Sequence, residues 1–339
     1  MSPGSLVDQT NRPNPHDFSR RAFLARSLAA TAALGAGADA VRALRAAETE
    51  ASDSKPMLKV VDTHQHLWDL KKFRLPWTAT QPALARDFTM ADYLAATAGV
   101  TIVKSVYLEV DVEPAQQQAE ADYVSQLCRR GEGPLVAAVI SGRPAAENFR
   151  SYIAPFKGHP YVRGLRQVLH GPSTPAGYCL QEPFIEGIRH LGELGLSFDI
   201  CIRPDELTDA AKLIDACPDT FFILDHCGNA DVQANDRVVW KRGMAAVAER
   251  KNVVGKVSGI IASAKPGKWQ VEDLAPIVNH TLEVFGPDRV MYGGDWPVCT
   301  LAASYKQWFD ALSAIVRDRP ELEQRQLLHD NAIKHYRLT

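Results

Sequence analysis

Two histidines, His64 and His66, stand one residue apart in the stretch 61-VDTHQHLWDL-70. The residues before them are apolar and β-branched, which is typical of a buried strand. Alternate side chains of a strand point to the same side, so both imidazoles can face one point. Imidazole binds divalent metals and transfers protons near neutral pH. The pair therefore predicts a metal site or a catalytic site, with a coincidence of packing as the alternative.

The elements that must position this pair follow a regular order. After Leu58, short apolar runs alternate with amphipathic segments such as 115–130, 205–217 and 236–250. The expected strands are 58–64, 102–110, 134–140, 161–166, 196–202, 220–226, 252–258 and 289–295. Eight strands, each followed by a helix, predict an α/β fold of one domain, a closed (β/α)8 TIM barrel over residues 56–339. An open doubly wound sheet would need a glycine-rich turn after its first strand, where this chain has His-Gln-His.

Ionisable residues stand at the expected carboxyl ends of these strands, where barrels of this kind build active sites. Taken in strand order, these residues and their neighbours are His64, His66, Glu109, Arg163, Arg166, Asp199, Cys201, Asp225, His226, Lys256, Ser258 and Asp295. Each has a structural explanation by itself, because a histidine can be a packing residue and an aspartate can cap a turn. Their joint occurrence at one end of the barrel predicts an active site.

Five segments together resemble the amidohydrolase superfamily, in particular its amidohydrolase-2 branch of barrel hydrolases. These segments are VDTHQHLWD, RGLRQVLH, LDHCGNAD, GKVSG and YGGDWPVC, in this order between Leu58 and Arg337. Within the branch, the resemblance is to lactonases that act on sugar-acid and dicarboxylate lactones. It implies a hydrolase that opens a lactone ring.

The resemblance also implies a role for each matching residue. His64 and His66 would be metal or substrate ligands, His226 would be catalytic, and Asp295 would activate water and also bind metal. Glu109 would complete a site for one divalent ion, zinc or manganese, although catalysis without metal stays open. A two-metal site is not expected, because the fifth strand, 197-SFDICIR-203, lacks a histidine.

The substrate is expected to be a small lactone that carries a carboxylate. Arg166, with Arg163, would hold that carboxylate by a two-pronged contact. The remaining expected substrate contacts are His170, Lys256 and Trp77. Two other functions stay open, a metal-dependent decarboxylase of an unsaturated acid and a non-catalytic sugar-acid binding protein.

Composition and the N-terminal segment predict which partners and which location the protein has. A net charge of −2 and a pI near 6.6 argue against a nucleic-acid partner. Arg20 and Arg21 precede an alanine-rich run, which predicts a twin-arginine export signal and polar linker over residues 1–55, and export by the twin-arginine machinery to the periplasm or the exterior. The uncharged run 27–38 is too short for a spanning helix of about 20 residues, so no stable membrane insertion is expected after cleavage.

Overall fold

The computed structural model describes residues 58–338. The expected export signal and linker over residues 1–55 lie outside these residues, and that expectation stays a prediction. None of the described helices is long and apolar enough to cross a membrane.

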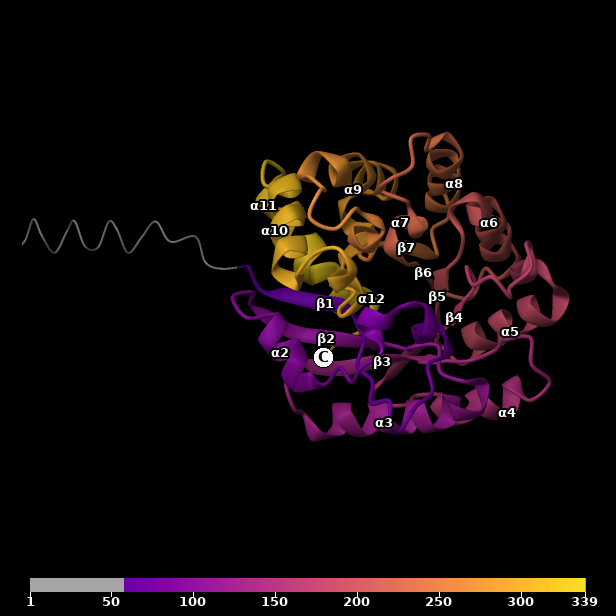
Figure 1. The fold of residues 1–339 in the computed structure, drawn as a ribbon. Coiled ribbons are helices and arrows are strands. Elements are labelled where there is room, and N and C mark those ends of the chain that lie inside the picture. Colours follow the sequence, from indigo (N-terminus) through magenta and orange to yellow (C-terminus); the bar gives the residue numbers. More distant parts are fainter. Residues whose placement is uncertain (1–57, 339) are drawn as a thin grey trace, which may run out of the picture. The chain divides into compact units, whose positions relative to one another are not determined.

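Eight parallel strands form one sheet in which each strand pairs with the next along the chain (Figure 1). The strands are β1 Val60–Gln65, β2 Ile102–Leu108, β3 Leu135–Ser141, β4 Val162–Val168, β5 Ser197–Cys201, β6 Phe222–Leu224, β7 Val253–Val257 and β8 Val290–Tyr292. The last strand returns to the first, since the Thr63 hydroxyl donates to the Tyr292 carbonyl at 2.6 Å and Gln65 bridges to Trp296. The predicted (β/α)8 barrel is confirmed.

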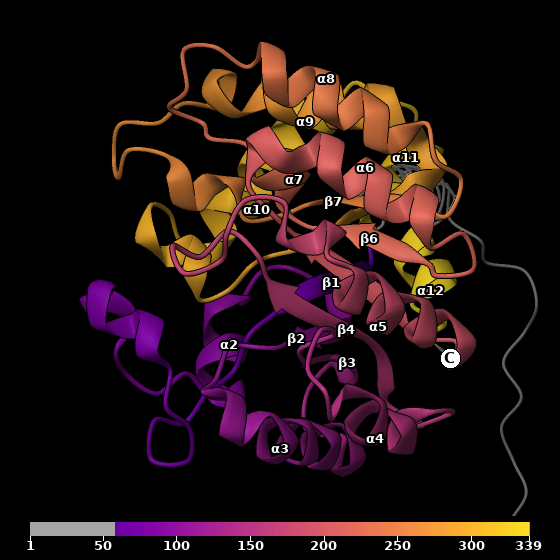
Figure 2. The same cartoon turned by 90° about the vertical axis from the view of Figure 1, so that its right-hand side faces the viewer.

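The helices cover the outer face of this barrel (Figure 2). They are α2 Met90–Ala96, α3 Gln117–Arg130, α4 Phe149–Ile153, α5 Glu182–Glu193, α6 Leu207–Ala216, α8 Val238–Ala248, α9 Val271–Phe285, α10 Tyr305–Val316, α11 Glu321–Arg325 and α12 Asn331–His335, with a short turn α7 at His226–Asn229. In α5, Phe184, Ile188 and Leu191 are buried and recur at helical spacing, so one face of this helix packs inward.

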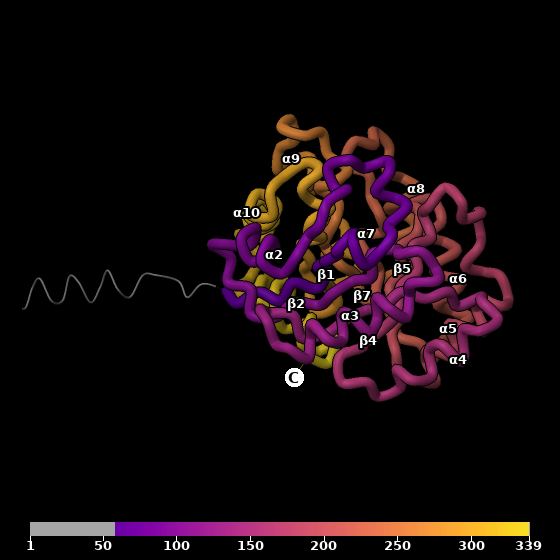
Figure 3. The backbone as a smooth tube through the Cα atoms, turned by 60° about the horizontal axis from the view of Figure 1, so that its bottom comes forward, coloured from indigo at the N-terminus to yellow at the C-terminus, as the bar shows by residue number. Residues whose placement is uncertain are grey.

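The chain runs once around the barrel, which brings its first and last elements together. Figure 3 shows α2, β1 and α10 on the same side, and the rings of Tyr93 and Tyr305 lie 6.0 Å apart there. A second, smaller apolar cluster joins inward residues of the strands to Ala332, Tyr336 and Leu338 of the C-terminal segment. This segment therefore packs against the inner face of the barrel, with Asn331 bonded to the carbonyl at the start of β8.

Candidate active site

A cavity of about 580 Å³ opens at the carboxyl ends of the strands. Two tryptophans, Trp68 and Trp77, form part of its wall. The polar and sulfur-containing side chains that line it are His66, Thr80, Asp111, Arg166, His170, Ser173, Cys201, His226 and Asp295. This is the place where (β/α)8 barrels carry their chemistry, so the cavity is the candidate active site.

A buried carboxylate, Asp62, ties the first strand to the loop after the last. Its Oδ1 accepts hydrogen bonds from the backbone N–H groups of His64 at 3.0 Å and Gly294 at 2.7 Å. Its Oδ2 accepts from the hydroxyls of Tyr93 at 2.9 Å and Tyr305 at 3.0 Å. Four donors on one carboxylate fix the spacing of the two chain segments. The Asp295 side chain is therefore presented next to the histidines of β1.

Backbone strain marks two residues of the site. Asp295 and His226 both have φ near 53°, in the left-handed region that residues other than glycine seldom adopt. Such conformations cost about 1 kcal/mol or more and cluster at functional sites. Gly259, with φ of 65°, passes so close beneath His226 that a Cβ there would lie 2.2 Å from Nδ1 of the ring. Glycine at this position leaves room for the imidazole, whose Nδ1 is 2.9 Å from Ser258 Oγ.

The hydrogen bonds of His66 fix which of its nitrogens faces Asp295. Nδ1 lies 2.9 Å from the Leu108 carbonyl oxygen. A carbonyl only accepts, so Nδ1 carries a hydrogen and neutral His66 has its lone pair on Nε2. That lone pair lies 3.3 Å from Oδ1 of Asp295. Two acceptors at this distance repel unless a proton or a cation lies between them.

His64 presents a second lone pair to the same carboxylate. Arg166 Nη1 lies 3.2 Å from its Nε2, and because a guanidinium only donates, the hydrogen of the ring is on Nδ1, facing Asp225 Oδ1 at 3.5 Å. Burial holds the pKa of His64 well below its usual value, the charge of Asp225 opposes this, and Lys256 adds to it. Neutral His64 therefore turns an acceptor nitrogen toward Asp295, whose Oδ1 is 3.5 Å away.

These donors fit a single divalent metal ion. His64, His66 and Asp295 offer ligand atoms that lie within 4.8 Å of one another. Two imidazoles and one carboxylate are a ligand set of zinc enzymes, in which a fourth position stays open for water. A second group, His64, Asp225 and His226, satisfies the same distance, but Lys256 and Arg166 already neutralise Asp225. Coordination by His64 Nε2 would use the lone pair that Arg166 occupies.

The sequence pattern of the amidohydrolase family matches residues 61–338. The chain belongs to the amidohydrolase family. The match and the site together make it a hydrolase, and the resemblance noted in its sequence is confirmed.

Relatives and solved structures agree with this assignment. The chain is 25% identical over 282 residues to L-fucono-1,5-lactonase of Burkholderia multivorans, covering 79% of this chain and 92% of the lactonase. An amidohydrolase of the same species, solved with bound zinc, shares the fold with a TM-score of 0.74 at 24% identity, covering 83% of this chain and 99% of that one. The fold also occurs in 2,6-dihydroxybenzoate decarboxylase from Rhizobium, with a TM-score of 0.56 at 13% identity, covering 84% and 99% of the two chains. Both structural likenesses concern the fold alone.

Several residues expected in this amidohydrolase site lie in its cavity wall. His66, His226, Asp295, Arg166, His170 and Trp77 all line the cavity. Trp77 is held by its Nε1, which donates to the Val110 carbonyl at 2.8 Å. His64 lies directly beneath, fully buried, with its ring centroid 4.4 Å from that of His226. Sequence spacing therefore located the group at one end of the barrel.

Glu109 and Lys256 differ from expectation because both are committed to protein partners below the cavity. Glu109 is fully buried, accepts from Arg166 Nε at 2.7 Å, and accepts from the Asp111 N–H at 2.6 Å. It is not among the clustered metal donors of the described residues. Lys256 is fully buried between Asp199 and Asp225, so the structure places it below the cavity and not in its wall, where a substrate contact was expected.

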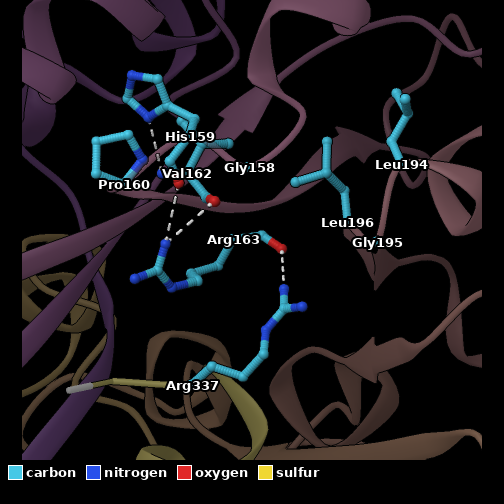
Figure 4. Close-up of a pocket in the computed structure, with 9 residues that line it drawn as sticks. All are labelled: Gly158, His159, Pro160, Val162, Arg163, Leu194, Gly195, Leu196 and Arg337. Atoms are coloured by element: carbon cyan, nitrogen blue, oxygen red, sulfur yellow. Dashed lines mark hydrogen bonds between the residues drawn. The ribbon is translucent and has the colours of Figure 1, made fainter.

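Arg163 lies away from the site, near the start of β4. Figure 4 shows its guanidinium directed at the carbonyls of His159 and Val162, at 3.3 and 3.4 Å. Arg337 of the C-terminal segment lies beside it. Arg163 and Arg166 are three residues apart in one strand and therefore point to opposite faces, so the structure does not bring Arg163 to the cavity beside Arg166.

Three contributors to the site had no assigned role in the sequence. Asp62 precedes His64 by two residues, so strand alternation was a usable signal for it. Asp225 directly precedes His226, and its role as the neighbour of His64 depends on a contact across the barrel. Asp111 follows β2 in the left-handed region, at φ of 49°, and lines the cavity while pairing with Arg143 at 2.9 Å.

Proposed function

We propose that this amidohydrolase opens a lactone ring by adding water that Asp295 activates. The observation that carries the proposal is the convergence of the Asp295 carboxylate and the acceptor nitrogens of His64 and His66 on the floor of the cavity. The likeness to L-fucono-1,5-lactonase supports a lactone as the substrate. Water, a lactone carbonyl and a general base are sufficient for the reaction.

Asp295 acts first as base and then as acid. The carboxylate takes a proton from water as the water oxygen attacks the carbonyl carbon of the lactone. The ring C–O bond then breaks, and Asp295 returns the proton to the leaving oxygen. The products are a carboxylic acid and a hydroxyl group, so one water molecule is consumed and Asp295 is regenerated.

His226 polarises the carbonyl in this proposal. Its Nδ1 is occupied by Ser258, which leaves Nε2 for the substrate. Burial lowers the pKa of His226, so the ring is neutral near pH 7. With the Ser258 hydroxyl donating to Nδ1, Nε2 carries the hydrogen and donates it to the oxygen on which negative charge develops.

His64, His66 and Asp295 are the residues that would hold a divalent ion, zinc or manganese. Such an ion, when bound, supplies a Lewis acid and lowers the pKa of water. The chain's own residues retain their roles: Asp295 takes and returns the proton, and His226 binds the carbonyl oxygen.

The charges around the cavity favour an uncharged lactone over one with a carboxylate. Arg166 is the single lysine or arginine in the cavity wall, among the described residues, and it is already bonded to Glu109, His64 and Asp225. A two-pronged contact with a substrate carboxylate would break these bonds. Asp295 adds negative charge to the wall, and Asp111, also in the wall, is paired with Arg143. We therefore replace the expected carboxylate-bearing substrate by an uncharged one.

Substitution of Asp295 tests the proposed base. Asp295→Asn keeps the shape of the side chain but cannot accept the proton, and general-base catalysis is worth about 10²- to 10⁴-fold. We expect kcat on lactones to fall by about this factor while circular dichroism and the melting temperature stay near those of the wild type. Asp288→Asn, exposed just before β8, is the matched control. Undiminished turnover by Asp295→Asn would exclude this residue as the base.

Product analysis separates the alternatives. Opening a lactone releases a proton and no gas, whereas a decarboxylase releases carbon dioxide. A binding protein gives calorimetric heat that saturates with ligand, and an enzyme gives heat that continues with turnover. Carbon dioxide release without acid, or saturable heat without turnover, would refute lactone hydrolysis.

A further inference from the structure

A set of charged side chains lies inside the barrel beneath the cavity. Lys256 Nζ is 2.7 Å from Asp199 Oδ2 and 3.0 Å from Asp225 Oδ1, and all three residues are fully buried. Tyr336, from the C-terminal segment, donates its hydroxyl to the same Asp199 oxygen at 2.7 Å. None of these residues lines the cavity, so the proposed reaction as described above does not use them.

Stability is a poor explanation for these charges. Barrel interiors are normally packed with branched apolar side chains. A buried ion pair seldom stabilises a fold more than apolar residues of the same volume, because both ions lose their hydration. Burial raises the pKa of Asp199 to about 6 even though Lys256 contacts it. The contacts made by Asp225 suggest what the charges do.

Asp225 is held at both of its oxygens by cations. Arg166 Nη1 donates to Oδ2 at 3.2 Å, and Lys256 lies at 3.0 Å from Oδ1. Two anchors on opposite oxygens fix the rotation of the carboxylate about its Cβ–Cγ bond. His64 Nδ1 then faces the fixed Oδ1 at 3.5 Å. Partners of this kind set the tautomer and orientation of an active-site histidine.

We propose that Lys256 and Asp199 are positioning residues, which fix the Asp225 carboxylate so that the His64 ring keeps its Nδ1 facing Asp225 and its Nε2 beside Arg166 and Asp295. Asp199 holds the Lys256 ammonium from the side opposite Asp225, and Tyr336 holds Asp199. The chain of contacts thus runs from the C-terminal segment to the floor of the active site. Its effect on turnover rests on the proposed function, whereas its effect on His64 does not.

The test uses a double variant of the full chain, Lys256→Met/Asp199→Asn. Lys256→Met alone would leave the Asp199 carboxylate without its cation and would destabilise the fold, because an uncompensated buried charge is costly. The double variant removes one positive and one negative charge. It therefore separates the loss of the Asp225 anchor from the presence of an unpaired charge. A variant with both Asp215→Asn and Arg250→Met, which removes a pair of 2.7 Å on the outer surface, is the matched control.

Two readouts decide the outcome. In ¹⁵N-histidine spectra, the His64 signals are assigned by their loss in His64→Asn. The wild type is expected to show hydrogen on Nδ1. The double variant, in which Arg166 still donates to Nε2, is expected to show a shifted Nδ1 signal because the Asp225 oxygen that faces Nδ1 is no longer held. The kcat of the double variant is expected to fall about 10- to 100-fold, the usual effect of losing a partner of an active-site ligand, with KM nearly unchanged. The control variant should match the wild type in both.

The outcomes that overturn the proposal are distinct from failure of the proposed function. A folded double variant with wild-type kcat, or with wild-type His64 signals, overturns it. A wild type that hydrolyses no lactone refutes the proposed function, but the His64 spectra still decide the positioning role. If the double variant does not fold, Lys256→Gln/Asp199→Asn, whose amides hydrogen-bond across the same gap, is measured in its place with the same expectations.

Discussion

At the scale of single residues, the decisive feature is that the acceptor nitrogen of His66 faces the Asp295 carboxylate with no donor between them. The Leu108 carbonyl sets the tautomer of His66, and Arg166 sets that of His64. His66 therefore turns its lone pair toward Asp295, and His64 Nε2, which accepts from Arg166, lies 3.5 Å from the same carboxylate oxygen. The backbone and the arginine, and not the histidines themselves, prepare the site for a proton or a cation.

A metal-binding prediction follows from this arrangement. Zinc chloride added to chelator-treated protein should raise the melting temperature, because a ligand that binds only the folded state stabilises it. His66→Ala should lose most of this rise, measured by differential scanning fluorimetry. His280→Ala is the control and should keep the rise, because its half-buried ring lies against the Lys241 carbonyl and the Trp240 ring, outside the candidate site. An equal rise in His66→Ala would mean that zinc binds elsewhere.

The charge of the cavity wall gives a second prediction. Two lactones with the same ring, one carrying a carboxylate and the other a hydroxymethyl group, should differ in kcat/KM by about 10-fold or more in favour of the uncharged one, since like charges in contact disfavour binding. Asp111→Asn should reduce the ratio of the two kcat/KM values, because it removes a carboxylate from the cavity wall. A preference for the carboxylate would show that Arg166 leaves its partners to bind substrate.

At the scale of elements, helix α3 brings a buried carboxyl group against β2. Glu120 accepts from the Tyr107 hydroxyl at 2.9 Å and from the Val110 N–H at 2.8 Å, and its Oε2 has no partner. Burial and the nearby charge of Glu109 raise the pKa of Glu120 to about 8. The folded protein therefore prefers the protonated form of this residue.

This shift predicts how stability depends on pH. Because the folded pKa lies above the unfolded one, the contribution of Glu120 is complete below the unfolded pKa near 4.5 and is lost as pH rises through about 8. Between about pH 5 and about pH 8, the wild type should lose free energy of unfolding at up to about 1.4 kcal/mol per pH unit. Glu120→Gln should not show this loss. Urea unfolding at several pH values measures both. Glu132, exposed after α3, is the control: the free energy of unfolding of Glu132→Gln should change with pH as that of the wild type does. If the free energy of unfolding of Glu120→Gln changed with pH as that of the wild type does, the raised pKa of Glu120 would be contradicted.

The sequence predicted the helices and strands more completely than it predicted the contacts between them. Apolar runs located all eight strands, and barrel geometry placed His64, His66, His226 and Asp295 at one end. Depth along a strand was not readable: Lys256 lies inside β7, below the cavity. The partners of Arg166 lie in β1 and at the ends of β2 and β6, far apart in the sequence. Only the folded chain shows that they already take up the hydrogen bonds of its guanidinium.

At the scale of the whole molecule, the C-terminal segment completes the barrel interior. Tyr336 and Leu338 pack against inward strand residues, and Asn331 Nδ2 donates to the carbonyls of Pro287 at 2.7 Å and Val290 at 2.8 Å. The family match extends to residue 338, which agrees with a segment that is part of the fold.

Removal of the Asn331 amide tests this role. Asn331→Ala leaves two backbone carbonyls without their donor, at a cost of about 1–3 kcal/mol each if they stay dry. The urea midpoint should fall without a change in slope. Lys334→Ala, exposed on the same helix, should leave the midpoint unchanged. A wild-type midpoint for Asn331→Ala would show that the segment does not contribute through these bonds.

The Asp62 clamp between the first strand and the loop after the last has a consequence for biosynthesis. His66 and Asp295 are 229 residues apart, yet they form one catalytic floor. During translation, the two histidines at the end of β1 are synthesised long before Asp295. On the proposed mechanism, a fragment that ends before β8 lacks Asp295 and should not turn over substrate, even where its other strands have paired. If Asp295 is the base, as we propose, enzymatic activity reports that synthesis has passed Asp295 and that the first and last strands have come together.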